Sequence, residues 1–196
     1  MKTLLRSLPV LILVLALSIP AIGKNVGALY EKAGGFSYDP PKGWNVREFP
    51  GMKFRISHAA AEGGFASNIN VVDEKFAGGL STYADANVVN LKKFFQKFTL
   101  LSRKDFLTDG KVKGIQIVTT NEQQGRMLRQ IFYIFARDNI KYVVTCTALA
   151  SKGDALDATF EKSMKSFRFH DVKKNEVVAP PAPPSKTDAP SKPAAP

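Results

Sequence analysis

The residue types that most often carry chemistry are few in this sequence and lie far apart. There are two histidines, His58 and His170, and one cysteine, Cys146. His58 continues the alternation of Phe54 and Ile56, which predicts a partly buried histidine, whereas we expect His170 at the surface. Zinc and calcium sites need several ligands at short, regular spacing, and the sequence has no paired histidines and no calcium-binding loop. The sequence therefore predicts no metal site.

The motifs of the common enzyme classes are also missing. The sequence contains no G-x-S-x-G turn, no P-loop and no dinucleotide fingerprint. A hydrolase would require folding to bring a serine and an aspartate to His58. Asp73 and Glu74 could hold a divalent ion weakly, and Gly78-Gly79 ahead of a helix could hold an anion. A protein with no catalytic, cofactor or metal residues is the simpler interpretation, and we take it as the prediction.

Basic residues are better candidates for a function. Lys92, Lys93 and Lys97 fall on the outer side of a predicted helix, and Arg126 and Arg129 flank the turn into a predicted central strand. Such a surface would speed and orient docking onto an acidic partner, with strong dependence on salt. The alternative is an ordinary solvated helix face. We take these five residues as the candidate partner-binding set.

The first 23 residues have the pattern of a signal peptide. Lys2 and Arg6 precede an apolar run over residues 8–19, which Pro20 ends just before the small residues at positions 21–23. The uncharged stretch of residues 7–23 is short for a membrane span. We therefore expect cleavage and export to a compartment outside the cytoplasm, with an uncleaved N-terminal anchor as the alternative.

Charge then indicates the class of partner. The full chain has 28 Lys and Arg against 17 Asp and Glu, and removal of residues 1–23 leaves 26 against 17, a formal charge of +9. For an exported protein, acidic protein surfaces, anionic lipid headgroups or wall polymers are better targets than nucleic acid. A basic surface that only maintains solubility is the alternative. We expect a monomer that is not itself transmembrane after cleavage.

A β-hairpin over residues 126–150 is the strongest structural prediction. Two apolar runs flank Asp138-Asn139, a pair that tolerates the positive φ angles of a tight turn. Residues 131–135 are apolar at every position, which is typical of a central strand covered on both faces. In residues 140–148 the apolar positions alternate with Lys141, Thr145 and Thr147, so we expect one face to be buried and the other partly wet. Cys146 falls on the buried face and is predicted to be a small core residue.

Two helices are predicted around this hairpin. Ser81-Thr82 is expected to cap the first, whose apolar stripe is Ala84, Val88, Leu91, Phe95 and Phe98. Gly153-Asp154 is expected to open the second, whose stripe is Leu156, Phe160, Met164 and Phe167. Residues 100–107 and 112–119 are predicted strands, joined by a turn at Asp109-Gly110.

The N-terminal part is expected to be mostly strands. Residues 24–34 are interpreted as a mobile lead-in or a short helix. A strand over residues 36–38 is expected to turn through Pro40-Pro41 and pair with residues 44–47. Residues 52–58 and 67–72 are two further strands. The predicted fold class is α+β: one domain over residues 35–170, with a central antiparallel sheet, an inserted helix and a C-terminal helix. The tail at residues 171–196, rich in Pro, Ala and Lys, is predicted to be disordered.

Several short motifs resemble the PsbP family. They are Phe36-Ser37-Tyr38 ahead of Pro-Lys-Gly-Trp44, Glu48-Phe49-Pro50-Gly51, Ser67-Asn68-Ile69-Asn70-Val71, Tyr142-Val143-Val144-Thr145-Cys146, and the stretch from Thr159-Phe160 to Phe169. The similarity spans residues 35–169, and it extends to a superfamily with DcrB-like envelope proteins and Mog-type Ran-binding proteins. The resemblance implies a central antiparallel sheet flanked by helices.

The resemblance also implies a class of function. In plants and cyanobacteria, PsbP-like proteins are lumenal extrinsic subunits of photosystem II that help its oxygen-evolving complex retain calcium and chloride. That role would apply here only in a photosynthetic organism, and calcium enters by resemblance alone. We therefore expect an exported accessory or assembly subunit that docks onto an envelope or membrane protein complex. The alternative is an extracytoplasmic protein that binds a small ligand or calcium.

Overall fold

The computed structural model describes residues 27–170 of the chain. The predicted signal peptide (1–23) and tail (171–196) lie outside the described residues. In chain order the elements are β1 (Leu29–Glu31), β2 (Phe36–Tyr38), β3 (Asn45–Arg47), β4 (Ile56–His58), β5 (Asn68–Lys75), α1 (Leu80–Phe94), β6 (Gln96–Leu107), β7 (Lys113–Gln123), β8 (Arg126–Arg137), β9 (Ile140–Leu149), a 3-10 turn (Ala150–Lys152), α2 (Asp157–Lys165) and β10 (Arg168–Phe169). The α+β prediction is confirmed.

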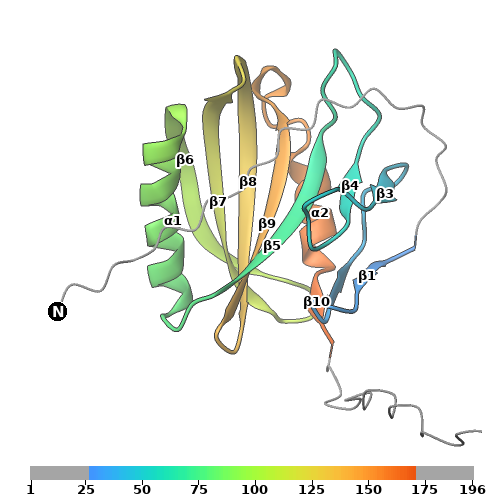
Figure 1. Cartoon of the computed structure of the whole chain (residues 1–196), viewed down its shortest axis with the longest axis vertical. Helices are drawn as coiled ribbons and strands as arrows, with labels where there is room; N and C mark the ends of the chain where they lie inside the picture. Colours follow the sequence, from blue (N-terminus) through green and yellow to red (C-terminus); the bar gives the residue numbers. More distant parts are fainter. Residues whose placement is uncertain (1–26, 171–196) are drawn as a thin grey trace, which may run out of the picture.

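Seven of the strands form one antiparallel sheet, in the order β3-β4-β5-β9-β8-β7-β6 (Figure 1). Strands β6 to β9 are consecutive hairpins, and β5 joins the far side of β9. In the predicted central hairpin, Arg137 pairs with Ile140 across a turn in which Asp138 has a φ of 55°. The turn at residues 108–112 also joins β6 to β7, as predicted, although Lys111 has the positive φ there.

Strand β8 is buried on both faces, as its all-apolar middle predicts. Strand β9 differs from the prediction, because Lys141, Thr145 and Thr147 on its second face are buried as well. A row of side-chain hydrogen bonds crosses that face: Gln130 donates to the Thr147 hydroxyl (3.2 Å) and accepts from Asn121 (2.7 Å). These bonds offset the cost of removing polar groups from water. The alternation in β9 therefore marks two buried faces, one apolar and one that carries Thr145 and Thr147 beside the apolar Val143.

Helix α1 lies on one face of the sheet over β6, β7 and β8. Its Tyr83, Ala84 and Leu91 pack against Ile117 and Phe132 of the sheet. The helix begins at Leu80 with Gly79 as its N-cap, so the predicted Ser81-Thr82 cap is wrong. It also ends at Phe94, earlier than the predicted stripe, because the chain takes an extended conformation at Phe95 and starts β6 at Gln96.

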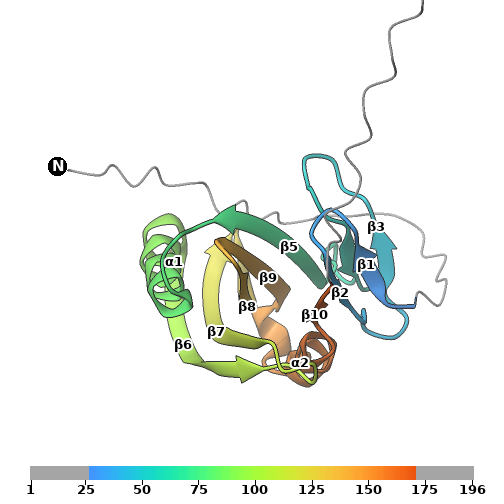
Figure 2. The same ribbon diagram turned by 90° about the horizontal axis from the view of Figure 1, so that it is seen from below.

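Helix α2 packs on the opposite face, which curls around it (Figure 2). Of its predicted stripe, Phe160 and Met164 are buried within α2 and Phe167 is buried two residues after its end, whereas Leu156 precedes the helix and is only partly buried. Helix α2 starts at Asp157, three residues after the predicted Gly153-Asp154 opening, because Gly153 ends the preceding 3-10 turn with a φ of 56°. The Phe167 ring stacks on that of Phe135, with centroids 4.2 Å apart.

The predicted pairing of residues 36–38 with residues 44–47 is wrong. Strand β2 lies in a separate sheet of order β1-β2-β10, whereas β3 pairs with β4 in the large sheet. The Pro40-Pro41 segment does not close a hairpin but carries the chain from one sheet to the other, since consecutive prolines lack the N–H groups that a ladder needs. Part of the predicted lead-in, Leu29–Glu31, is strand β1.

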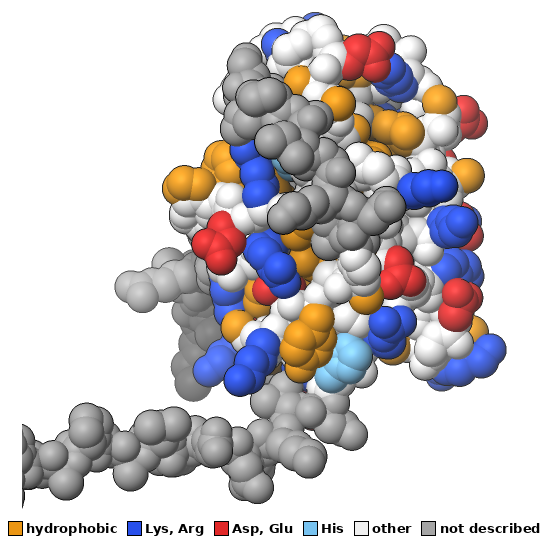
Figure 3. Space-filling view, turned by 90° about the vertical axis from the view of Figure 1, so that its right-hand side faces the viewer, with side chains coloured by type: hydrophobic (Ala, Val, Ile, Leu, Met, Phe, Trp, Pro, Cys, Tyr) orange, Lys and Arg blue, Asp and Glu red, His pale blue; other side chains and the backbone are white. Residues whose placement is uncertain are grey.

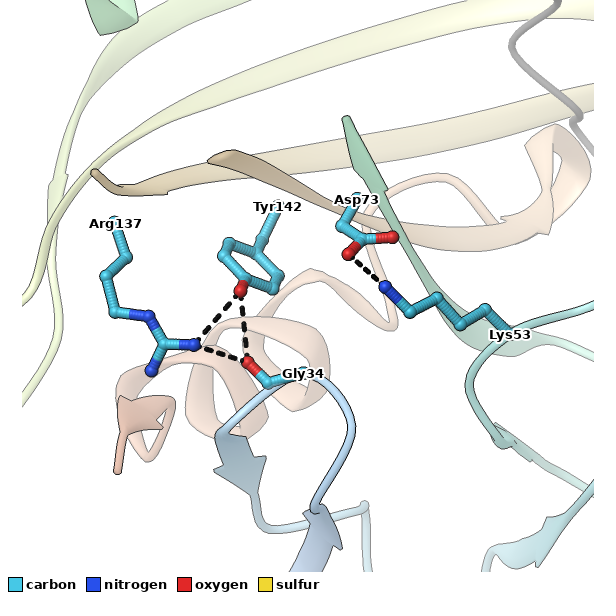
Figure 4. A network of polar contacts seen from close by, with 5 residues as sticks. All are labelled: Gly34, Lys53, Asp73, Arg137 and Tyr142. Carbon is cyan, nitrogen blue, oxygen red and sulfur yellow. Dashed lines mark hydrogen bonds and ion pairs between the residues drawn. The ribbon is translucent and has the colours of Figure 1, made fainter. Parts of the chain in front are cut away.

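Arg137 joins the small sheet to the large one (Figure 4). Its guanidinium donates to the carbonyl oxygens of Gly34 (2.8 Å), Gly35 (2.9 Å) and His170 (3.0 Å), and to the Tyr142 hydroxyl (3.1 Å). The Tyr142 hydroxyl donates in turn to the Gly34 carbonyl (3.0 Å). One side chain at the end of β8 therefore connects the first and last parts of the described chain.

Replacing Arg137 tests this connection. Arg137→Lys keeps the charge but cannot reach all four acceptors with one ammonium group, so we expect a loss of about 2–3 kcal/mol in the free energy of unfolding. The measurement is urea unfolding monitored by circular dichroism. Arg168→Lys, at an exposed arginine, is the matched control and should change stability by less than about 0.5 kcal/mol. Equal effects of both substitutions would contradict the role of Arg137.

Candidate functional site

Three of the five predicted basic residues come together where α1 leads into β6. Lys92 and Lys93 are in the last turn of α1, and Lys97 follows at the start of β6. We call these three lysines the basic corner. Both ribbon views show α1 and β6 side by side at one end of the molecule, opposite the small sheet (Figures 1 and 2). These three lysines thus lie within six residues of one another at the α1–β6 junction, although Lys97 belongs to a strand and not to the helix.

The basic corner is accessible and only partly neutralised. All three lysines are exposed, and Lys97 forms an ion pair with Glu122 (2.5 Å). Within residues 27–170, no acidic side chain pairs with Lys92 or Lys93. Cations in the last turn of a helix also suit the negative end of its dipole. The corner can therefore carry two free positive charges without a cost to the fold.

The two arginines of the predicted set do not join this corner. Arg129 makes a two-pronged ion pair with Asp157 at the start of α2, with N–O distances of 3.0 and 2.6 Å. The hydrogen bonds to Asp157 raise the pKa of Arg129 above its ordinary value. Arg126 donates to the Gly64 carbonyl oxygen (3.0 Å) in the loop between β4 and β5. Both guanidinium groups thus hold parts of the fold in place, which local sequence does not reveal because their partners are distant along the chain.

The histidines lie in separate places. His58 is partly buried, as predicted, and its Nδ1 lies 2.8 Å from the Ala59 carbonyl oxygen. His170 was expected at the surface, but it is half-buried: its Nε2 lies 2.7 Å from the Ser37 hydroxyl and its ring meets that of Tyr30 edge-on. Neither histidine contacts a carboxylate among the described hydrogen bonds. The described contacts therefore supply no acid–base pair for a hydrolase.

The remaining candidate groups are engaged elsewhere. Asp73 pairs with Lys53 (Figure 4), and Glu74 accepts from the Tyr83 hydroxyl (2.8 Å). Cys146 is a buried core residue, as predicted, and burial raises the pKa of its thiol well above the ordinary value. Over residues 27–170, no three His, Cys, Asp or Glu side chains are grouped so that they could hold a metal ion. No helix in that part of the chain is long and apolar enough to cross a bilayer.

A cavity of about 730 Å³ lies between α2 and the turn that follows β2. Trp44, Asp39 and Lys162 are among its lining residues, with Thr159 and Asp109. The Trp44 ring packs edge-on against Phe160 of α2, with centroids 5.9 Å apart. The cavity combines an aromatic wall with charged and hydroxyl groups, and its volume lies within the range of small-molecule sites.

Comparison with known proteins gives a fold but no family. No protein-family model matches the chain, and no curated protein is similar to it. Among solved structures, it resembles cyanobacterial PsbP (CyanoP) from Synechocystis sp. PCC 6803, with a TM-score of 0.56 and 11% sequence identity over 78% of this chain and 98% of the other.

Two other solved structures are similar to a comparable degree. LpqN of Mycobacterium tuberculosis, described as involved in cell envelope biogenesis, has a TM-score of 0.53 and 11% identity, over 69% of this chain and 83% of the other. PA94 of Pseudomonas aeruginosa, a protein of unknown function, has a TM-score of 0.50 and 14% identity, over 63% of this chain and 94% of the other. At such identities the likeness concerns the fold alone: the chain has a PsbP-like fold.

Proposed function

We propose that this protein is an extracytoplasmic accessory or assembly domain without catalytic activity, which docks onto a membrane protein complex of the cell envelope through the basic corner. The observation that carries the proposal is the exposure of Lys92 and Lys93 with no acidic partner in the described chain. The signal-peptide pattern of the first 23 residues and the fold shared with CyanoP and LpqN support the location.

The physical role of the corner is to steer and orient. Exposed charges contribute little to affinity, because water and salt screen them, but they raise the rate of encounter with a surface of opposite charge. Figure 3 shows the other end of the molecule, where Lys and Arg side chains are interspersed with Asp and Glu. A partner with an acidic surface would therefore meet this protein at its α1–β6 end.

Which complex is bound depends on the organism. CyanoP is named as a cyanobacterial PsbP, and LpqN as a protein of cell envelope biogenesis. If this protein comes from a photosynthetic organism, photosystem II with its oxygen-evolving complex is the expected partner. Otherwise an assembly in the envelope is expected. Calcium binding belongs to this proposal only through the resemblance to PsbP.

Charge reversal tests the docking surface. The triple variant Lys92→Glu, Lys93→Glu, Lys97→Glu should bind its partner about 10- to 100-fold more weakly at low salt, since each exposed pair contributes about 0.2–1 kcal/mol and reversal adds repulsion. The measurement is capture of membrane complexes from native envelope extracts, with the mature protein as bait.

The matched control reverses three exposed lysines elsewhere, Lys32, Lys75 and Lys111, none of which has an ion-pair partner within residues 27–170. It has the same net charge as the corner variant and should retain binding. Unchanged capture by the corner variant would remove these lysines from the docking surface.

The cavity beside α2 favours a second function, the binding of a small ligand. Its volume of about 730 Å³ falls within the usual range for ligand pockets, about 300–1,000 Å³. Trp44 lines it and is the only tryptophan in the chain. Its fluorescence is therefore a specific reporter of occupancy.

Under this second function, a bound ligand should change Trp44 emission and raise the melting temperature, because a ligand that binds only the folded state stabilises it. Thr159→Phe, which fills the cavity from α2, should abolish both responses. The titrations use calcium, manganese and a panel of small apolar compounds. If none of them alters either signal, the ligand-binding function is excluded for those classes.

A further inference from the structure

The region around the basic corner exposes large apolar side chains as well as lysines. The exposed fractions are 62% for Phe94, 52% for Val89, 48% for Leu101 and 43% for Leu100. Of the other exposed large hydrophobic residues of the described chain, Leu107 ends β6 six residues after Leu101, whereas Tyr30 and Met127 belong to β1 and β8. Single exposed apolar residues are ordinary, but several within one short stretch of chain mark a contact surface.

Helix geometry directs part of this set away from the protein. Leu91 is buried against the sheet, which fixes the orientation of the last turns of α1. Val89 and Lys93 are four residues apart, so their side chains lie next to each other on one side of the helix. That side is roughly opposite Leu91 at about 100° per residue. An apolar and a basic side chain therefore point outward together.

Two irregularities in β6 determine how Lys97 and Leu101, which belong to the same exposed surface, are presented. The register between β6 and β7 shifts once between Gln96 and Thr99 and again between Leu100 and Ser102. Lys97 and Leu101 fall in these interruptions, and Lys97 has a φ of 50°. Bulges of this kind re-aim side chains and stop pairing at the edge of a sheet. The edge strand is thus shaped to display Lys97 and Leu101 and not to add another strand at that point.

The stretch of chain that carries this surface is basic. Between Asp85 and Asp105 the sequence has no acidic residue, while its basic residues are Lys92, Lys93, Lys97, Arg103 and Lys104. Two neighbouring acids form ion pairs: Asp85 with Arg103 (3.3 Å) and Glu122 with Lys97. Positive charges next to exposed Phe, Val and Leu complement a surface with negative headgroups above a hydrocarbon layer.

From this combination we infer that the α1–β6 end binds directly to anionic lipid, with Lys92, Lys93 and Lys97 among the headgroups and Phe94 and Leu101 in the boundary layer beneath them. The inference rests on the proposed function, since it places the docked protein against the bilayer that holds its partner. A bilayer fits the surface better than a protein pocket does, because the apolar side chains protrude and need no matching cavity.

The expected magnitudes follow from the number of groups. A lysine near an anionic membrane contributes about 1 kcal/mol, or about fivefold in binding, so loss of three lysines should weaken binding about 100-fold. Phe94 and Leu101 are already partly covered by protein, so we expect their replacement by serine to weaken binding about tenfold.

Vesicle sedimentation tests the inference without any partner protein. The mature protein should bind vesicles made of equal parts phosphatidylglycerol and phosphatidylcholine, lose binding as salt rises, and not bind pure phosphatidylcholine. Lys92→Gln, Lys93→Gln, Lys97→Gln and Phe94→Ser, Leu101→Ser should reduce binding as stated. Lys32→Gln, Lys75→Gln, Lys111→Gln is the control and should bind like the unchanged protein. All of these proteins share the same N-terminus, so any contribution from it cancels.

A second measurement reports contact directly. Cys146 is buried, so an environment-sensitive dye will react selectively with Phe94→Cys in the folded protein. Its emission should shift to the blue on phosphatidylglycerol vesicles, while a dye on Lys111→Cys should not respond. Absence of vesicle binding, or equal losses in the corner and control variants, would overturn the inference.

Native envelope membranes separate the inference from the proposed function. If the mature protein binds these membranes through the basic corner but does not bind lipid vesicles, the inference is wrong and the proposed function stands. If it binds neither, both are wrong. If it binds vesicles, and protease treatment of the envelope membranes leaves binding unchanged, the lipid inference holds and the protein complex is not the attachment site.

Discussion

The central strands of the large sheet are buried on both faces, so other elements have to cover the sheet on both sides. Two separate apolar clusters result, one between the sheet and α1 and the other between the sheet, α2 and the small sheet. Each helix is fixed to the sheet in a different way. Leu91 of α1 packs into the apolar cluster on its face of the sheet, and the first residue of α2, Asp157, forms an ion pair with Arg129 of β8. The burial of apolar area on two sides gives the domain its stability with a single cysteine and no disulfide.

Local sequence was sufficient where a strand or turn is defined by neighbouring residues. The hairpin at Asp138-Asn139 and the double burial of β8 follow from residue types within about twelve positions, and both are present. The polar face of β9 was misjudged because the partners that bury Thr147, such as Gln130, lie on another strand. The small sheet was missed for the same reason, since β2 pairs with Arg168–Phe169 at the far end of the chain. Such pairings are decided by tertiary packing and leave no local pattern.

The same distinction between local and distant contacts applies to the candidate site. The helical positions of Lys92 and Lys93 could be predicted from the sequence, whereas the place of Lys97 on a strand and the engagement of Arg126 and Arg129 within the fold could not. The exposure of Phe94 could not be predicted from the sequence either. The helical stripe predicts that Phe95 points inward. That Phe94 remains exposed depends on the end of α1 at Phe94 and on the bulges of β6, which only the structure shows.

The pairing of β2 with β10 has a consequence for the order of assembly. Residues 36–37 find their second neighbouring strand only at residues 168–169, and the Arg137 guanidinium gains its His170 acceptor at the same moment. A chain still being synthesised therefore cannot complete its small sheet, however early the N-terminal segment emerges. The small sheet therefore closes only when almost the last described residue is present, after every strand of the large sheet has been made.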